Sequence, residues 1–381
     1  MTCHLAGMDH DVLPPLRPLS ASERQLIELV RRGGGVARVD LAAGAGLTGA
    51  SVTRLVGGLI DMGIFDEQVE HQGRQGQPKR LLSLRAGSVF AAGISFSLSR
   101  MDMVVIDLTG QTLARQSLNI EGRNARAVAD CAAEALSALL DRHNVPRHRF
   151  CGVGCAIPGN FGTFSTLIRA HEFFLDFDDD RAMQAFSDAF DVPVFMENDG
   201  AAAALGEYLW GYQSDDGASL FLIHIGHGLG GGAVIDGRPF RGAHGNACLP
   251  GVLFPYGTPR PTGQDLMQVL QDGGQSIADF DALRDLTTAG RAILSGWINR
   301  AGRQLGQAAR VVTGLIDPTV IVVGGRLPGP VNTALVAAAL SEPLPGPSRR
   351  LTIPPLRASV LGPAGGALGA AGVPLAAQVF G

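Results

Sequence analysis

Apolar residues near the start of the chain recur at helical spacing in three short segments. Ser20 and Ser22 are candidate N-caps of a first helix, which the glycines at 33–35 end. A second helix is predicted over residues 40–45, and a tight turn follows it. Thr48 is a candidate N-cap of a third helix, which reaches about Met62. Its apolar residues form one buried stripe: Val52, Leu55, Val56, Leu59 and Ile60. Two short helices, a turn and a striped helix are typical of a helix-turn-helix.

The polar face of the third predicted helix suits contact with DNA. Ala50, Arg54, Gly57 and Asp61 fall opposite the apolar stripe, and Ser51 and Thr53 flank them. Small and hydroxyl-bearing residues let a helix enter the major groove, where one arginine can bind guanine. Gly57 and Gly58 lower helix propensity, which a close approach to another backbone would offset; they are otherwise simply tolerated.

A basic hairpin follows the three helices. Residues 64–65 and 81–84 predict two strands, and the polar segment 71–80 between them predicts the tip of a wing. Residues 71–85 carry four basic side chains and no acidic one. Residues 1–85 hold 10 basic and 9 acidic side chains, so the net charge of −4 for the whole chain leaves −5 for the remainder. The positive charge therefore lies where phosphates would be met. We predict these DNA contacts: Thr48, Ala50, Ser51, Thr53, Arg54, Arg74, Lys79 and Arg80. A winged helix used for dimer or protein contacts is the alternative.

Beyond Val89, predicted strands and helices alternate. Strands are expected at 104–107, 152–157, 192–196, 220–225, 233–235 and 320–323, and helices at 126–142 and 288–313. This pattern predicts an α/β domain that binds ligands at the carboxyl ends of its strands. Residues 361–381 lack charge, but their prolines and glycines favour a packed terminal segment over a membrane span.

Composition narrows the classes of protein further. Hydrophobic residues make up 46% and charged residues 17%, which excludes wholesale disorder. The five cysteines are scattered and include no CxxC pair, so no disulfide framework is expected. No basic segment followed by an apolar one opens the chain, so we predict a cytoplasmic protein without a membrane anchor.

Four loops that follow predicted strands carry a family resemblance. They are Pro158-Gly159-Asn160, Glu197-Asn198-Asp199, the glycine run 226–232 and Gly324-Gly325. Their order and spacing resemble the ROK family, which contains sugar kinases and sugar-responsive repressors. The resemblance implies an N-terminal winged helix-turn-helix plus a two-lobed actin-like (ribonuclease H-like) ATPase-type domain. The resemblance covers about residues 20–381, and residues 1–19, with three prolines and no periodicity, predict a flexible arm before it. The predicted domains are a DNA-binding domain (20–85) and an effector-binding and oligomerisation domain (88–381), with lobes of roughly 88–200 and 201–381.

The same resemblance suggests where an effector binds. In the family's kinases the aspartate of the Asn-Asp loop is the base for the sugar hydroxyl, and Asn198 and Asp199 keep both residues. The alternative role for this pair is to cap the alanine-rich helix that follows. The resemblance also implies effector contacts from the loop after Pro158, at Gly159, Asn160, His171 and Glu172; for His171 and Glu172 a solvated loop is equally expected.

Several residues depart from the kinase pattern. His227 replaces a hydroxyl residue, and residues 93–97 lack the aspartate that would help to hold Mg²⁺. Leu249 and Val252 replace a glutamate and a histidine expected to contact sugar. Residues 253–275 lack the cysteines of the family's zinc loop, so no metal is predicted. Asp265 is a candidate to compensate for the lost polar side chains.

We therefore predict a DNA-binding regulator, with repression of carbohydrate-related genes favoured, and neither an enzyme nor a cofactor-dependent protein. The expected partners are double-stranded operator DNA, a small carbohydrate-like effector and further copies of the chain, as a dimer or tetramer. The long helix at 288–313 is a candidate interface between copies. Two alternatives stay open: a sugar kinase with a DNA-binding appendage, and a ligand-free DNA-binding or scaffolding oligomer.

Overall fold

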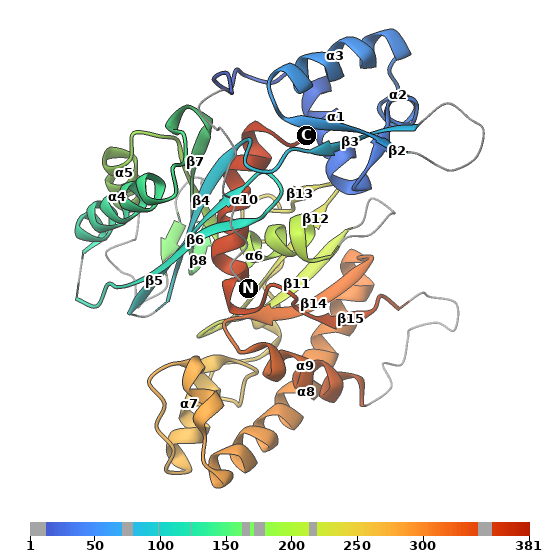
Figure 1. Cartoon of the computed structure of the whole chain (residues 1–381). Helices are drawn as coiled ribbons and strands as arrows, with labels where there is room; N and C mark the ends of the chain where they lie inside the picture. The colour runs from blue at the N-terminus through green and yellow to red at the C-terminus, as the bar shows by residue number, and fades with distance from the viewer. Residues whose placement is uncertain are drawn as a thin grey trace.

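The computed structural model describes residues 13–70, 79–97, 99–122, 124–161, 168–170, 180–212, 219–341 and 353–381. A small head (residues 20–85) sits on one end of a larger body (residues 88–381), which holds two five-stranded sheets (Figure 1). The body is a mixed α/β structure of the two-lobed kind that the sequence predicts.

The head contains the predicted helix-turn-helix. Its helices are α1 (Ala21–Gly33), α2 (Arg38–Ala45) and α3 (Gly49–Asp61). Ser20 and Glu23 form a capping box at the start of α1, and Gly34 ends it with φ 63°, a conformation that glycine adopts at little cost. The strands β1 (Val36–Ala37), β2 (Phe65–Glu70) and β3 (Lys79–Leu84) form a sheet in the order β1-β3-β2. The β2–β3 pair is the predicted wing.

The first lobe is built on a mixed sheet in the order β10-β7-β4-β5-β6. Its strands are β4 (Phe90–Phe96), β5 (Arg100–Asp107), β6 (Thr112–Asn119), β7 (Phe150–Ile157) and β10 (Val194–Asn198). β4, β7 and β10 run parallel, whereas β4, β5 and β6 form antiparallel pairs. Helices α4 (Ala125–Arg142) and α5 (Asp180–Ala189) cover its outer face, and β8 (Gly159–Phe161) pairs with β9 (Ile168–Ala170).

The second lobe repeats this plan with the order β13-β12-β11-β14-β15. Its strands are β11 (Leu220–Ile225), β12 (Leu229–Ile235), β13 (Arg238–Pro239), β14 (Val320–Gly325) and β15 (Leu356–Ala358). Helices α7 (Gly263–Asp272), α8 (Thr288–Ile316) and α9 (Gly329–Leu340) lie on its outer face. Short 3₁₀ turns occupy Arg147–Arg149, Pro250–Leu253, Phe280–Asp285 and Gly362–Ala364.

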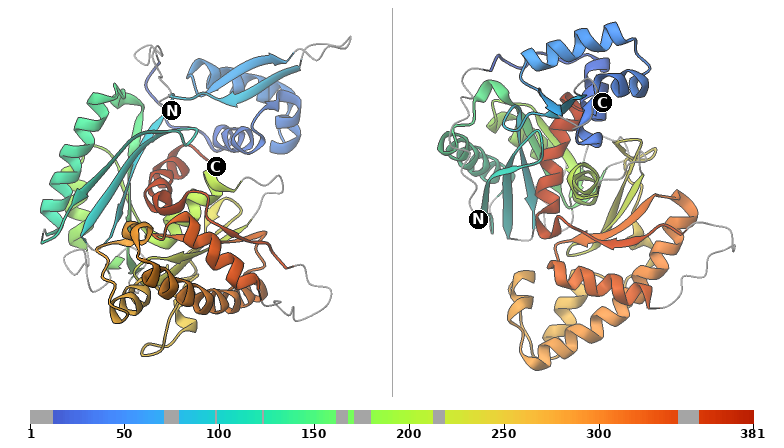
Figure 2. Two further views of the ribbon diagram at one scale, coloured as in Figure 1. Left: turned by 60° about the horizontal axis from the view of Figure 1, so that its bottom comes forward. Right: turned by 45° about the vertical axis from the view of Figure 1, so that its right-hand side comes forward.

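Two inner helices fill the space between the lobes. They are α6 (Asp199–Gly206), extended by a π-helical turn at Glu207–Gly211, and α10 (Gly365–Gln378), which is the predicted packed terminal segment (Figure 2). Glycines permit this close packing: a Cβ added at Gly93 would lie 1.9 Å from the carbonyl oxygen of Ala367, and one at Gly154 would lie 1.8 Å from that of Ala370. In the part of the chain that the structure describes, no helix is long and apolar enough to cross a membrane.

The head rests on the body through α1. Leu26, Ile27 and Val30 belong to the same hydrophobic cluster as Leu375 and Phe380 at the end of α10. Figure 2 shows the C-terminal end of α10 close to α1. The cluster therefore continues from the head into the body.

One buried arginine ties three segments together. Arg149 donates hydrogen bonds to the carbonyl oxygens of Pro14 (2.7 Å), Met62 (3.0 Å) and Ser88 (2.5 Å). The sequence predicted a flexible arm over residues 1–19. The segment that begins at Leu13, which the structure describes, is instead held against the body, and residues 1–12 lie outside the described residues.

Candidate nucleic-acid interface and effector site

The face of α3 that points away from the head's core carries the predicted DNA contacts. Thr48 caps the helix by accepting a hydrogen bond from the backbone N–H of Ser51, at 3.2 Å. Ala50, Thr53 and Arg54 are exposed, and Arg54 makes no ion pair with any described residue. This face of α3 is therefore accessible, its side chains are mostly small, and Arg54 gives it a positive charge.

Gly57 and Gly58 have no packing role inside the described chain. A Cβ added at either residue would meet nothing within 4 Å. Both φ angles are helical, so alanine would fit both positions and raise helix propensity. The absent side chains thus leave space on the outside of α3.

Acidic and basic side chains lie together at the base of the wing. Glu67 on β2 accepts hydrogen bonds from Arg38 (2.9 Å) and Arg80 (3.1 Å), and the Arg80 side chain remains 66% exposed. These two arginines lower the pKa of the Glu67 carboxyl, against the opposing effect of its burial. Arg38 was not predicted from the sequence. Of the other predicted wing contacts, Arg74 and the side chain of Lys79 lie outside the described residues.

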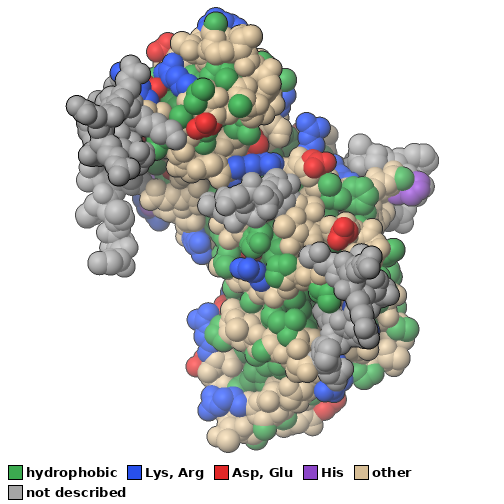
Figure 3. Space-filling model, turned by 90° about the vertical axis from the view of Figure 1, so that its right-hand side faces the viewer, with side chains coloured by type: hydrophobic (Ala, Val, Ile, Leu, Met, Phe, Trp, Pro, Cys, Tyr) green, Lys and Arg blue, Asp and Glu red, His purple; other side chains and the backbone are tan. Residues whose placement is uncertain are grey.

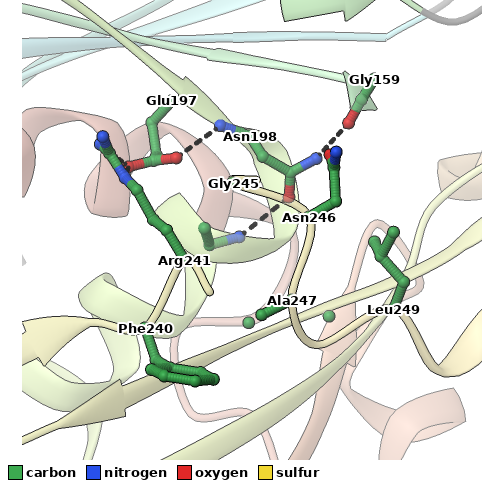
Figure 4. Close-up of a pocket in the computed structure, with 12 residues that line it drawn as sticks. Gly159, Glu197, Asn198, Phe240, Arg241, Gly245, Asn246, Ala247 and Leu249 are labelled. Atoms are coloured by element: carbon green, nitrogen blue, oxygen red, sulfur yellow. Dashed lines mark hydrogen bonds and ion pairs between the residues drawn. The ribbon is translucent and has the colours of Figure 1, made fainter. Parts of the chain in front are cut away.

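Asn198 ends β10 and caps α6, at the carboxyl end of the first lobe's sheet. Its side-chain oxygen accepts from the backbone N–H groups of Gly200 (2.9 Å) and Ala201 (3.1 Å), and its Nδ2 donates to the carbonyl oxygen of Gly159 at 2.5 Å. Figure 4 shows Asn198 directed toward Gly159. The capping role is therefore present and uses the side-chain oxygen, while one of the two amide hydrogens bonds to Gly159.

Glu197 and Arg241 form an ion pair beside Asn198. The Glu197 side chain is 1% exposed; its Oε2 accepts hydrogen bonds from Arg241, and its Oε1 accepts one from the backbone N–H of Asn198 at 2.9 Å. Figure 4 shows Arg241 reaching this carboxylate from the loop after β13. Sequence reasoning singled out neither side chain for this role, although a glutamate at the end of a buried strand is a usable signal.

The pocket around Asn198 is almost filled. Its cavity volume is about 10 Å³, and its lining includes Gly159, Asn198, Arg241 and Leu249. Such a volume holds roughly one water molecule. Leu249, which replaces the expected glutamate, does line the pocket, whereas Val252 is 80% exposed and does not. A sugar ring would need this pocket to open.

Of the predicted effector contacts, the structure brings Gly159 and Asn198 together. His171 and Glu172 lie outside the described residues, as does the side chain of Asn160. Asp265 was the candidate to replace the missing polar groups, but it does not line the pocket. Its carboxylate accepts hydrogen bonds from Trp297 Nε1 and from Arg300, so it joins α7 to α8.

Asp199 faces a buried histidine on the second lobe. Its Oδ1 accepts from the backbone N–H of Gly200 at 2.8 Å, and its Oδ2 lies 3.6 Å from His224 Nε2. Burial lowers the pKa of His224, Asp199 raises it and Arg326 lowers it, with a net decrease below its ordinary 6.5. His224 is therefore neutral at pH 7 and contributes no cation to offset the Asp199 charge.

Arg326 of the second lobe forms hydrogen bonds with the first lobe. It follows β14 and donates to Asp102 Oδ2 (2.8 Å), Ser95 Oγ (2.6 Å) and the carbonyl oxygen of Phe96 (2.5 Å). All three acceptors lie on the β4–β5 hairpin, where the resemblance placed a phosphate-binding loop without its aspartate. A cation of the chain itself thus occupies this position. The sequence signal that could have identified Arg326 is a charged residue directly after a predicted buried strand.

The glycine run 226–232 has a packing explanation. The return strand begins at Leu229, earlier than the predicted residue 233, so the last glycines lie within β12. A Cβ on Gly232 would lie 2.6 Å from the carbonyl oxygen of Gly200. Gly232 therefore allows β12 to pack closely against the start of α6. Among the described residues no group of three or more His, Cys, Asp or Glu side chains is placed to hold a metal ion.

Comparison with known sequences relates the chain to the ROK family and to a DNA-binding regulator. The sequence profile of the ROK family matches residues 91–251. The uncharacterized protein y4fQ of Sinorhizobium fredii is 50% identical over 97% of this chain and 94% of that protein. The DNA-binding transcriptional dual regulator NagC of Escherichia coli is 22% identical over 78% of this chain and 79% of that protein.

Solved structures share the fold. A ROK family transcriptional regulator described as a homolog of the Escherichia coli MLC protein is 21% identical, with a TM-score of 0.67 over 93% of this chain and 95% of that chain. A ROK family glucokinase from Streptomyces griseus, in complex with glucose and AMPPNP, is 20% identical, with a TM-score of 0.61 over 74% of this chain and 98% of that chain. The regulator therefore matches head and body, and the glucokinase matches a shorter part.

Proposed function

Because the chain belongs to the ROK family, we propose that it is a DNA-binding transcriptional regulator, acting as a repressor of carbohydrate-related genes in the cytoplasm. The observation that carries this proposal is the outer face of α3. That face presents small residues, the exposed Arg54 and two glycines with open space beside them. A helix of this shape can lie deep in the major groove. The likeness to NagC, itself described as a DNA-binding regulator, supports the same role.

In this proposal the head recognises DNA, and the body responds to the effector. Residues 20–85 bind operator DNA, and residues 88–381, with lobes of roughly 88–200 and 201–381, bind an effector and join copies of the chain. A two-fold symmetric dimer would place its heads on half-sites about one helical turn apart. α8 is the proposed interface between copies.

The proposed effector is a small carbohydrate-like molecule at Gly159, Asn160, Asn198 and Asp199, with His171 and Glu172 completing the site. The second hydrogen of the Asn198 amide and the Asp199 carboxylate are the groups available to hydroxyls. Since the pocket holds only about 10 Å³, binding requires the lobes to separate. Their separation would change the spacing of two heads on DNA.

Selection of genomic fragments by the purified protein, at stated salt, tests the DNA-binding role. Enrichment of a few promoters that share a palindrome is the expected result. Arg54→Ala should then weaken binding to the selected sites, and Arg80→Ala should weaken binding to all sequences and flatten the salt dependence. Unchanged affinity in both variants, or binding that is equal on all fragments, would refute the proposal.

A sugar kinase is the second candidate function, and the Asp199 carboxylate favours it, because one oxygen makes no hydrogen bond to the described residues. Arg326 opposes it, since this side chain fills the position expected for phosphate binding. We propose that the chain is not an enzyme. Turnover in an ADP-release assay with a panel of sugars, abolished by Asp199→Ala, would overturn this part of the proposal.

A further inference from the structure

A large cavity lies where the head meets the body. We call it the junction cavity. It is bounded by α1 of the head, by the end of α10 and by residues 237–241 of the second lobe. Its volume is about 790 Å³, whereas the pocket around Asn198 measures about 10 Å³. Pockets for small organic ligands span about 300–1,000 Å³. The junction cavity is thus of ligand size in the structure as it stands.

The lining of the junction cavity carries an excess of positive side chains. Its charged side chains are Arg24, Arg32, Arg238, Arg241, Glu28 and Glu197. Both glutamates are already in ion pairs, since Glu28 accepts from Arg31 and Arg32 and Glu197 accepts from Arg241. In Figure 3 basic side chains, in blue, gather where the head meets the rest of the molecule.

Two of these arginines have hydrogen-bonding capacity to spare. Arg24 donates through Nη1 to the carbonyl oxygen of Ala377 (3.0 Å), but its buried Nε has no hydrogen-bond partner among the described residues. Arg238 is exposed and makes no ion pair with any described side chain. Arg24, like Arg238, makes no ion pair with any described side chain, so an anion in the cavity could form charge-assisted hydrogen bonds with both guanidinium groups. Leu205, Leu209 and Phe380 supply an apolar wall beside these cations.

We propose that the junction cavity binds a small organic anion, with its carboxylate or phosphate on Arg24 and Arg238 and its carbon skeleton on the apolar wall. This inference extends the proposed function: the ligand contacts both head and body, so it stabilises the docked head by mass action. The Glu197–Arg241 pair lines the junction cavity and the Asn198 pocket alike. An anion that attracts Arg241 would loosen the wall between the two pockets.

Calorimetric titration of the full chain tests the inference with three probes: salicylate, decanoate and glucose 6-phosphate. They differ in anionic group and in apolar skeleton, so their order of affinity identifies the preferred chemistry. At least one should bind in the millimolar range or more tightly. Arg238→Ala should weaken that binding about tenfold or more, and Arg24→Gln should weaken it as well. Arg115→Ala, an exposed arginine of β6 that does not line the cavity, is the matched control and should bind normally.

Two results would overturn the inference. One is the absence of binding by all three anions, and the other is equal binding by Arg238→Ala and Arg115→Ala. Fragment selection in the absence of any anion tests the proposed DNA-binding role separately. A chain that binds an anion through Arg238 but selects no DNA would refute that role and leave the junction site standing.

Discussion

Replacement of Arg149 tests whether one buried cation holds head and body together. Its side chain is fully buried, and burial lowers the pKa of its guanidinium, with a smaller contribution from Arg85. The three carbonyl oxygens that it binds belong to the arm before α1, to the residue after α3 and to the link between head and body. Arg149→Met keeps much of the side-chain volume and removes all the donors.

The expected loss follows from these contacts. A buried carbonyl oxygen left without its donor costs about 1–3 kcal/mol, so three of them cost about 3–9 kcal/mol when the guanidinium is removed. Desolvation of the guanidinium offsets several kcal/mol of this. Because the variant leaves the carbonyl oxygens without a donor, we expect the free energy of unfolding to fall by about 3–5 kcal/mol.

Urea unfolding, followed by tryptophan fluorescence, measures this loss. Trp210 packs against the cluster shared by head and body and Trp297 is buried in the second lobe, so the emission of the two tryptophans reports on unfolding of the body. Arg147→Met is the control: two residues away, this side chain is 55% exposed and pairs with Asp141 at the surface. Its loss should stay below about 1 kcal/mol. Equal losses in the two variants would refute the role assigned to Arg149.

Three further variants have defined outcomes. Gly57→Ala should raise the stability of α3 by about 0.5–1 kcal/mol and lower affinity for selected DNA; unchanged affinity would contradict a close approach at this face. The hydrogen bond from Arg17 is the largest cause of the lowered pKa of Glu23, about 2 against an ordinary 4.5. The stability that this carboxylate contributes is therefore present above pH 4.5 and is lost as pH falls toward about 2. Glu23→Gln should flatten acid unfolding, measured by circular dichroism, in that window; an unaltered curve would contradict this. Arg326→Ala should speed amide hydrogen exchange in β4 and β5, because the bonds that join the lobes are lost. Unchanged exchange there would show that Arg326 does not restrain the lobes.

Elements with local signals were predicted well from the sequence. The caps at Ser20 and Thr48 act within three residues of themselves, so the starts of α1 and α3 are readable from short segments. The apolar stripe of α3 is equally local. For α2 no capping side chain is present, and the helix begins at Arg38 rather than at residue 40.

The parts that could not be predicted depend on residues far apart in the chain. Arg326 meets Asp102 and Ser95, and Arg149 meets Pro14 and Met62, so no sequence spacing reveals these contacts. The small volume of the pocket around the candidate effector residues could not be predicted for the same reason, because it depends on how loops from both lobes pack there. Residue identity predicted that Gly159 and Asn198 belong to one candidate site, and the structure brings them together, but it did not predict the small volume of the pocket around them.

The position of α10 has a consequence for the order of synthesis. The head is translated first, yet its α1 contacts α10 and a residue that follows it: Arg24 donates to the carbonyl oxygen of Ala377, and the Arg31 guanidinium lies over the ring of Phe380. On the ribosome, a newly made head therefore lacks these contacts until α10 emerges. Docking of the head becomes a late step in biogenesis, and a nascent chain acquires its final head orientation only when the body is complete.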